Sequence, residues 1–334
     1  MKAVQVHTPG GPEALLLVDL PEPMAGPGQV RVKVHAIGVG RPDVLIRNGT
    51  YKWMPPLPAI PGAEAAGVVD AVGEGVTTLA VGARVLVSAR DLPQRGGCYV
   101  ESIAVPADAP YPLPDSVAFT DAVSLPNLQM AQALLSLGNL RGDVAAAARS
   151  VLITGAAGGV ATMLAQLARY RGLQTIGTAR SALKRDYALS NGFDAVEDAD
   201  EGPLRDRVLA LTGGRGVDLA FDPIGGTLLT ECLHCLAPLG TAVSYNIVAG
   251  MPSEQVLKTL RDLLGKSLAV RVFSIHTFDQ DRARRRALME SSIALMAAGH
   301  VRAPRPTLMP MSQVRQAHAV LDAGQTMGKI VLQP

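Results

Sequence analysis

A glycine-rich turn is the first feature of this sequence whose residue types suggest a chemistry. The apolar run 151–154 leads into Gly155, Gly158 and Gly159, and a helical stretch follows at once. Glycine permits a sharp turn and a close approach to phosphate, and the free N–H groups at a helix start attract an anion. With Ala161 at the third small position, strand, turn and helix together predict a site for the pyrophosphate of a dinucleotide. The alternative is a turn that serves only the packing of helix against strand.

The end of the next apolar run, 174–179, bears on which dinucleotide is bound. Sites for NAD usually carry an acidic residue about 20 residues after the glycines, where it binds the ribose. This chain has Arg180, Ser181 and Lys184 there, and the first carboxylate is Asp186. Basic side chains attract the 2′-phosphate of NADPH. We therefore predict NADPH as the cofactor; the alternative is that the two cations are ordinary surface charges.

Composition limits the remaining classes of function. The 334 residues are 48% apolar and 4% aromatic, and 31 basic residues nearly balance 29 acidic ones. A net charge of +2 argues against a nucleic-acid partner. No run reaches the roughly 18 apolar residues of a membrane span, and three cysteines do not form a disulfide framework. We expect a cytoplasmic protein with a small-molecule substrate and no membrane partner.

The elements that must position these residues follow different secondary-structure patterns in two parts of the chain. The first 120 residues are β-rich, with β-branched runs at 30–39, 66–73 and 83–89 and a proline-rich extended loop at 51–61. From about residue 150, strands alternate with helices, which predicts an α/β fold with a doubly wound parallel sheet. The strands expected there are 151–154, 174–179, 217–222 and 240–246, and one of the expected helices is 228–240. Residues from about 300 return to strand patterns and can rejoin the first domain.

Several motifs in this order resemble one family. They are GPEAL, GPGQVRVKV, PDVLIRNGTY, IPGAEAAGVVDAVGEGV, GAAGGV, FDPIGG and the closing GKIVL. Together they resemble the zinc-free quinone oxidoreductase (zeta-crystallin) branch of the medium-chain dehydrogenase/reductase superfamily. The resemblance implies a GroES-like β-rich catalytic domain at 1–120, completed by about 300–334, and a Rossmann cofactor domain at 121–299.

The resemblance also implies positions around the cofactor. Tyr51 would lie beside the nicotinamide, and it is the candidate catalytic residue. The pyrophosphate turn corresponds to Ala157, Gly158, Gly159 and Val160. The nicotinamide half would be lined by Ser244, Asn246 and Phe273.

The chain departs from the zinc-dependent relatives of that superfamily. Gly40 and Ala63 stand where those relatives have Cys and His ligands, and Cys98 is the single cysteine in the region of their structural zinc lobe. We therefore expect no metal. Without a metal to stabilise an alkoxide, we expect a reductase that transfers hydride from NADPH to a quinone or an activated C=C such as an enone. An enoyl-thioester reductase and a low-turnover NADPH-binding protein remain alternatives, and we expect a homodimer.

Three further features have structural interpretations. Asp43 and Arg47 have the spacing of a helical ion pair, with substrate contact as the alternative. Cys232 and Cys235 form a C-x-x-C without a second pair, which indicates buried helix cysteines. His318 lies in an amphipathic helical pattern, and we expect a structural role for it.

Overall fold

The computed structural model describes residues 1–137, 149–252 and 255–334. They divide into two compact units. The first unit comprises Met1–Pro126, Met289–Gly299 and Ala303–Pro334, and the second comprises the described parts of Asn127–Leu288 together with His300–Arg302. These units are groups of residues in contact, and their limits do not test the domain boundaries expected from the sequence. The boundaries 1–120 and 121–299 therefore stay a prediction.

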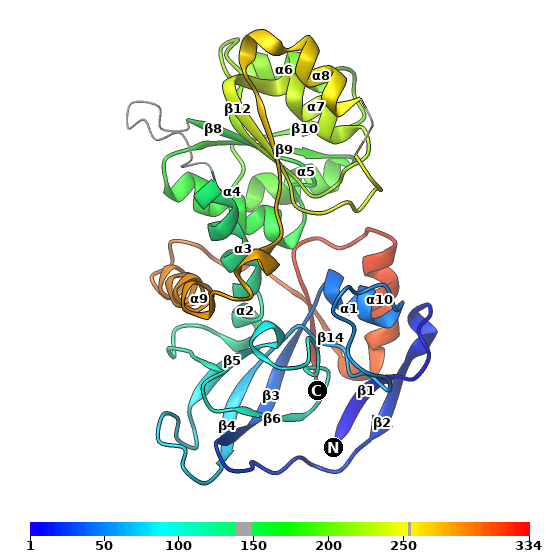
Figure 1. Cartoon of the computed structure of the whole chain (residues 1–334), viewed down its shortest axis with the longest axis vertical. Coiled ribbons are helices and arrows are strands. Elements are labelled where there is room, and N and C mark those ends of the chain that lie inside the picture. The colour runs from blue at the N-terminus through cyan, green and yellow to red at the C-terminus, as the bar shows by residue number, and fades with distance from the viewer. Residues whose placement is uncertain (138–148, 253–254) are drawn as a thin grey trace. The chain divides into compact units, whose positions relative to one another are not determined.

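A mixed β-sheet forms the body of the first unit, drawn mainly in blue and cyan in Figure 1. Its strands lie in the order β14-β15-β3-β4-β5-β7, and β6 also pairs with β3. Their bounds are β3 Gln29–Val39, β4 Glu64–Val72, β5 Arg84–Ser88, β6 Ser102–Pro106, β7 Tyr111–Pro112, β14 Thr307–Pro310 and β15 Ile330–Gln333. The last strand pairs antiparallel with β3, so the C-terminal residues complete a sheet begun by the N-terminal ones.

Alternating burial explains why β3 forms where it does. Val30, Val32 and Val34 are buried on one face of the strand, and polar residues alternate with them. β-Branched side chains favour such a pleated, half-buried surface. These valines join a core that also takes in a separate two-stranded sheet of β1 (Lys2–Val6) and β2 (Leu15–Asp19). The helices of this unit are α1 Arg41–Arg47, α2 Phe119–Ala122 and α10 Val314–Asp322.

A parallel six-stranded sheet forms the second unit, in the order β10-β9-β8-β11-β12-β13. The strands are β8 Ser150–Ile153, β9 Gln174–Ala179, β10 Ala195–Asp198, β11 Val217–Asp222, β12 Leu236–Ser244 and β13 Ala269–Val272. Numbered from β8, the order is 3-2-1-4-5-6, that of a dinucleotide-binding Rossmann sheet. This confirms the predicted doubly wound α/β fold.

Helices cover both faces of this sheet. The helices are α4 Gly159–Tyr170, α5 Ala182–Ser190, α6 Leu204–Leu211, α7 Leu228–Cys235 and α8 Val256–Asp262. In Figure 1, α4 and α5 lie on one side of the sheet and α6, α7 and α8 on the other. Two further helices, α3 (Leu125–Ser136) and α9 (Arg282–Ala297), contribute residues to both units. Across the described ranges, no helix has the length and hydropathy needed to cross a membrane.

The predicted helix over 228–240 is wrong in its last five residues. Helix α7 ends at Cys235, and strand β12 begins at Leu236. Pro238 disfavours a helical conformation for the residue before it and lacks the N–H that a helix interior needs. The strand expected at 240–246 therefore begins four residues earlier, and it ends at Ser244.

Candidate functional site

The glycine-rich turn of the second unit has the geometry of an anion-binding site. Gly155 has a φ of +63°, a conformation that favours glycine. Ala156 N–H donates to the carbonyl of Thr178 at 2.9 Å, which ties the turn to the end of β9. Gly158 is the N-cap of α4 and has no side chain to occupy the first N–H groups of the helix. Those groups are therefore left for a ligand beside the exposed Gly158.

Two cations gather at the end of β9. Arg180 is exposed, and among the described residues it has no ion-pair partner. Ser181 begins α5 by accepting a hydrogen bond from the N–H of Lys184 at 3.4 Å. Burial, and then the charge of Arg180, lower the pKa of Lys184, so the two basic side chains lie close enough to repel each other. Asp198, the neighbouring acid at the end of β10, is paired with Arg185 instead. The arrangement favours an added anion.

Ser244 and Phe273 lie together at the ends of β12 and β13. The carbonyl of Ser244 accepts a hydrogen bond from Phe273 N–H at 2.9 Å, and the Ser244 hydroxyl donates to the carbonyl of Asn246 at 3.4 Å. The Phe273 ring is buried and packs against Phe278, with centroids 5.9 Å apart. The cofactor-binding residues predicted in this unit therefore lie beside the carboxyl ends of the parallel strands. This is where ligands bind in such folds.

A buried carboxylate that sequence reasoning missed holds this edge together. Asp222 ends β11 and accepts hydrogen bonds from Thr154 Oγ1 at 2.5 Å, Ile224 N at 3.0 Å and Gly225 N at 2.9 Å. Burial raises its pKa, and these three donors oppose the rise. Because Thr154 follows β8, the carboxylate joins the two strands between which the strand order reverses. An Asp directly before the turn residues Pro-Ile-Gly-Gly was the available signal.

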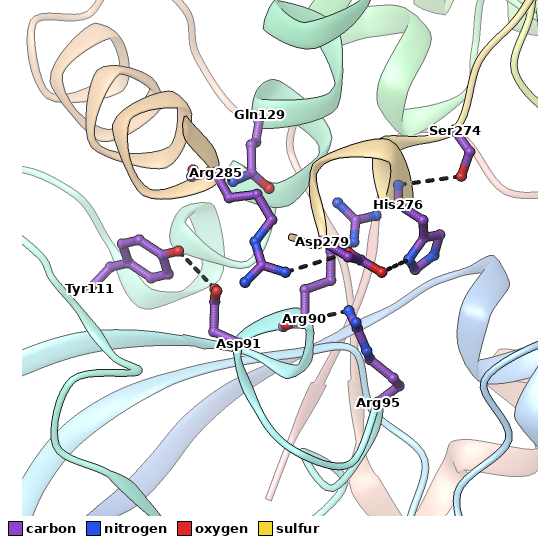
Figure 2. Close-up of polar contacts among 9 residues, drawn as sticks. All are labelled: Arg90, Asp91, Arg95, Tyr111, Gln129, Ser274, His276, Asp279 and Arg285. Carbon is purple, nitrogen blue, oxygen red and sulfur yellow. Dashed lines mark hydrogen bonds and ion pairs between the residues drawn. The ribbon is translucent and has the colours of Figure 1, made fainter. Parts of the chain in front are cut away.

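A second polar chain fixes the segment after Phe273. Figure 2 shows Asp279 between His276 and Arg285; its Oδ2 lies 3.0 Å from His276 Nδ1 and its Oδ1 3.4 Å from an Arg285 nitrogen. The amide of Gln129 donates to the carbonyl of Arg285 at 2.8 Å. In the first unit, the same figure shows the Tyr111 hydroxyl donating to Asp91 at 2.7 Å. Within the second unit, the contacts of Asp279 and Gln129 tie together residues 276–285, the segment that follows Phe273.

Tyr51 belongs to the first unit and follows helix α1. Its N–H donates to the carbonyl of Leu45 at 3.0 Å, and its ring meets the edge of Trp53 at a centroid distance of 5.7 Å. The surrounding residues 51–61 form no helix and no strand longer than an isolated bridge. This confirms the extended loop that the prolines of this stretch predicted.

A buried ion pair lies beside the two positions where zinc-dependent relatives have ligands. Glu64 and Lys329 are each 5% exposed and are in direct contact. A Cβ placed on Gly40 would be 3.8 Å from Lys329 Nζ, and one on Gly38 would be 2.5 Å from Glu64 Oε1. Gly40 and Ala63 themselves offer no ligating side chain. Charged residues set within apolar strand sequences were the signal for this pair.

The predicted ion pair between Asp43 and Arg47 is wrong. Both residues are described and buried, and Arg47 is paired with Asp322 at 2.9 Å. Asp43 accepts hydrogen bonds from Gly40 N at 2.7 Å and Gly62 N at 3.1 Å. Helix spacing indicates which side chains are neighbours, but a residue of α10, remote in sequence, supplies the better-placed charge.

The cysteine prediction is confirmed. Cys232 and Cys235 lie in α7, and both are buried free thiols. Burial raises the pKa of each thiol, which disfavours the reactive thiolate. In the part of the chain that the structure describes, no group of three or more His, Cys, Asp or Glu side chains is arranged to hold a metal ion.

Comparison with known proteins identifies the family. Two family models match: "Alcohol dehydrogenase GroES-like domain" over residues 26–115 and "Zinc-binding dehydrogenase" over residues 159–291. A quinone oxidoreductase of Pseudomonas aeruginosa is 32% identical over 336 residues, which cover 100% of this chain and 99% of that protein. The chain belongs to the quinone oxidoreductase branch of the medium-chain dehydrogenase/reductase superfamily. It is an oxidoreductase of that branch.

Two solved structures match over the whole chain. Escherichia coli quinone oxidoreductase, complexed with NADPH, matches with a TM-score of 0.84 at 28% identity, covering 100% of both chains. A structure described as an NAD-dependent alcohol dehydrogenase matches with a TM-score of 0.87 at 26% identity, again covering 100% of both chains.

The buried pair of the first unit makes a testable prediction about stability. Glu64→Gln leaves the Lys329 ammonium buried without its counter-charge, and removing one partner of such a pair typically costs about 3–5 kcal/mol. Urea unfolding should show this loss, whereas Glu64→Leu combined with Lys329→Met should recover most of it. Asp19→Asn, which breaks an exposed pair with Lys2, is the control and should change stability little. Unfolding of Glu64→Gln at the wild-type urea concentration would contradict the assigned role.

Proposed function

We propose that the protein is an NADPH-dependent, zinc-independent reductase that transfers hydride to a quinone or an activated C=C. The observation that carries the proposal is the exposed Arg180 at the end of β9, with Lys184 close to it in the first turn of α5 and the glycine turn beside it. The two positive charges attract a 2′-phosphate. The NADPH bound to the Escherichia coli relative supports this choice.

The residues at the sheet edge fit the parts of the cofactor. Ala157, Gly158, Gly159 and Val160 would bind the pyrophosphate through backbone N–H groups. Arg180, Ser181 and Lys184 would bind the 2′-phosphate, and Ser244, Asn246 and Phe273 would line the nicotinamide half. Bound NADPH supplies the hydride. The chain's contribution is to hold the nicotinamide and the acceptor in the orientation that hydride transfer needs.

The residues near Gly40 and Ala63 favour reduction of a conjugated acceptor over alcohol oxidation. Alcohol oxidation needs an alkoxide stabilised by a Lewis acid, and neither position offers a ligand for one. Hydride addition to an enone or a quinone gives an enolate or hydroquinone anion whose charge is delocalised. Hydrogen bonds, including one from the Tyr51 hydroxyl, are enough to stabilise such an anion.

Cofactor preference tests the role of the cation pair. The wild-type protein should prefer NADPH to NADH, and Arg180→Ala should raise the KM for NADPH about tenfold, because it removes a charge-assisted contact to phosphate. Arg205→Ala, at another exposed arginine of the same unit, should leave both values unchanged. Equal use of NADH by the wild-type protein would refute the proposed cofactor.

The reaction class can be tested on chelator-treated protein whose zinc content has been measured. Such protein should contain no stoichiometric zinc, oxidise NADPH with 1,4-quinones or short enones, and fail to oxidise simple alcohols with NADP⁺. Tyr51→Phe should slow reduction about tenfold, less than the loss of an essential acid. Preferential turnover of enoyl thioesters, or saturable NADPH binding without turnover, would instead support one of the two alternatives. Alcohol dehydrogenase activity alone would contradict the proposal.

We also propose a cytoplasmic homodimer joined through the parallel sheet. Strand β13 is the edge of that sheet as described, and it pairs with β12 on one side. Its Val272 is 84% exposed, although it is a large apolar residue on an open edge. Such an edge invites pairing with a second strand.

Light scattering should therefore give twice the chain mass. Val272→Lys should shift the protein towards monomer, because a charged edge resists strand pairing. Val81→Lys, at an exposed valine of the first unit, should remain dimeric. A wild-type monomer at micromolar concentration would argue against this assembly.

A further inference from the structure

The residues just before Tyr51 form a hydrogen-bonded turn at the end of α1. Asn48 Oδ1 accepts hydrogen bonds from the N–H and the hydroxyl of Thr50, at 3.1 and 2.6 Å. The N–H groups of Thr50 and Tyr51 both donate to the carbonyl of Leu45, at 2.9 and 3.0 Å. The turn therefore gives Tyr51 and the residues after it a defined starting direction.

Three consecutive side chains beyond this turn lie in contact. The rings of Tyr51 and Trp53 meet edge-on, with centroids 5.7 Å apart and an angle of 61° between their planes. The Lys52 ammonium lies over the Trp53 ring, 5.4 Å from its centroid. Both rings are partly buried, whereas Lys52 is exposed. An aromatic surface and a cation thus lie side by side next to the candidate catalytic residue.

The charge of Lys52 is not neutralised by an acid of its own region. In residues 41–61 the single acidic residue is Asp43, which is buried and accepts hydrogen bonds from backbone N–H groups. Among the residues that the structure describes, Lys52 takes part in no ion pair; its contact is with the Trp53 ring. The ammonium can therefore attract an anion that approaches the two rings.

We infer that Lys52 and Trp53 form a recognition site for a planar aromatic molecule with an anionic substituent, and that the acceptor is a quinone of this kind. The aromatic part would pack against Trp53, and the carboxylate or sulfonate would face Lys52. Hydride from NADPH and a proton from solvent would convert the quinone to the hydroquinone, and the anionic substituent would stay unchanged. The inference deepens the proposed reductase function, and its consequence for turnover rests on that function.

Binding of redox-inactive probes tests the site without turnover. Calorimetry on the full chain with NADP⁺ should show 2-naphthoate binding about threefold more tightly than 2-naphthamide at low salt, as expected for an exposed charge pair. The difference should vanish in Lys52→Gln, and in the wild-type protein at about 0.5 M salt. Lys33→Gln, at an exposed lysine of β3, is the matched control and should retain the difference. Trp53→Leu should weaken the binding of both probes about fivefold.

Kinetics with 1,4-naphthoquinone and its 2-sulfonate test the consequence for the reaction. Lys52→Gln should raise the KM of the sulfonate about threefold relative to that of the parent quinone, because it removes a charge that only the sulfonate uses. Trp53→Leu should raise the KM of both quinones about fivefold relative to that of a short enone, which has no aromatic ring.

The binding experiment can overturn the inference by itself. Equal binding of 2-naphthoate and 2-naphthamide by the wild-type chain, or binding of neither, would do so. A preference for 2-naphthoate that survives in Lys52→Gln would also do so. If the probes behave as expected but no quinone consumes NADPH, the proposed reaction fails and the recognition site stands.

Discussion

The cost of burying a carboxylate organises both units of this protein. A carboxylate removed from water must regain its hydrogen bonds from the protein, and backbone N–H groups are the donors always at hand. Asp222 regains them from the turn after β11 and from Thr154, and in doing so it joins the two central strands of the parallel sheet. Asp43 regains them from Gly40 and Gly62, and in doing so it joins the start of α1 to the turn that leads into β4. In each unit, satisfying one acid defines a loop.

The two acids differ in what surrounds them. Burial raises the pKa of Asp222, and its three hydrogen-bond donors oppose that rise. Asp43 also has a second carboxylate, Glu64, near enough to disfavour its charge, and Lys329 offsets this only in part. Burial is the largest cause of the raised pKa of both carboxylates, and the charge of Glu64 raises that of Asp43 further.

Local patterns predicted what depends on local sequence. Alternation of strands and helices gave the parallel sheet, and glycine spacing gave the turn at 155–159, because both follow from backbone geometry within a few residues. Partners distant in sequence were not accessible in this way. Lys329 lies 265 positions after Glu64. Arg47 is paired with Asp322 of α10, not with Asp43, which helix spacing indicates. The predicted helix over 228–240 is wrong at its end for a local reason, because Pro238 disfavours a helical conformation in the residues before it.

The region around Gly40 shows why the absence of two ligands constrains the chemistry. Small residues at 40 and 63 leave no donor for a metal, but the charged residues next to them remain: Glu64 is held by Lys329, and Asp43 is held by backbone amides. A second cation there would compete with Lys329 for Glu64. Glu64 and Lys329 are thus paired with each other, and Asp43 fixes the backbone at Gly40 and Gly62. The function that we propose therefore draws on hydrogen bonds and on orientation, which favours acceptors whose added charge is delocalised over several atoms.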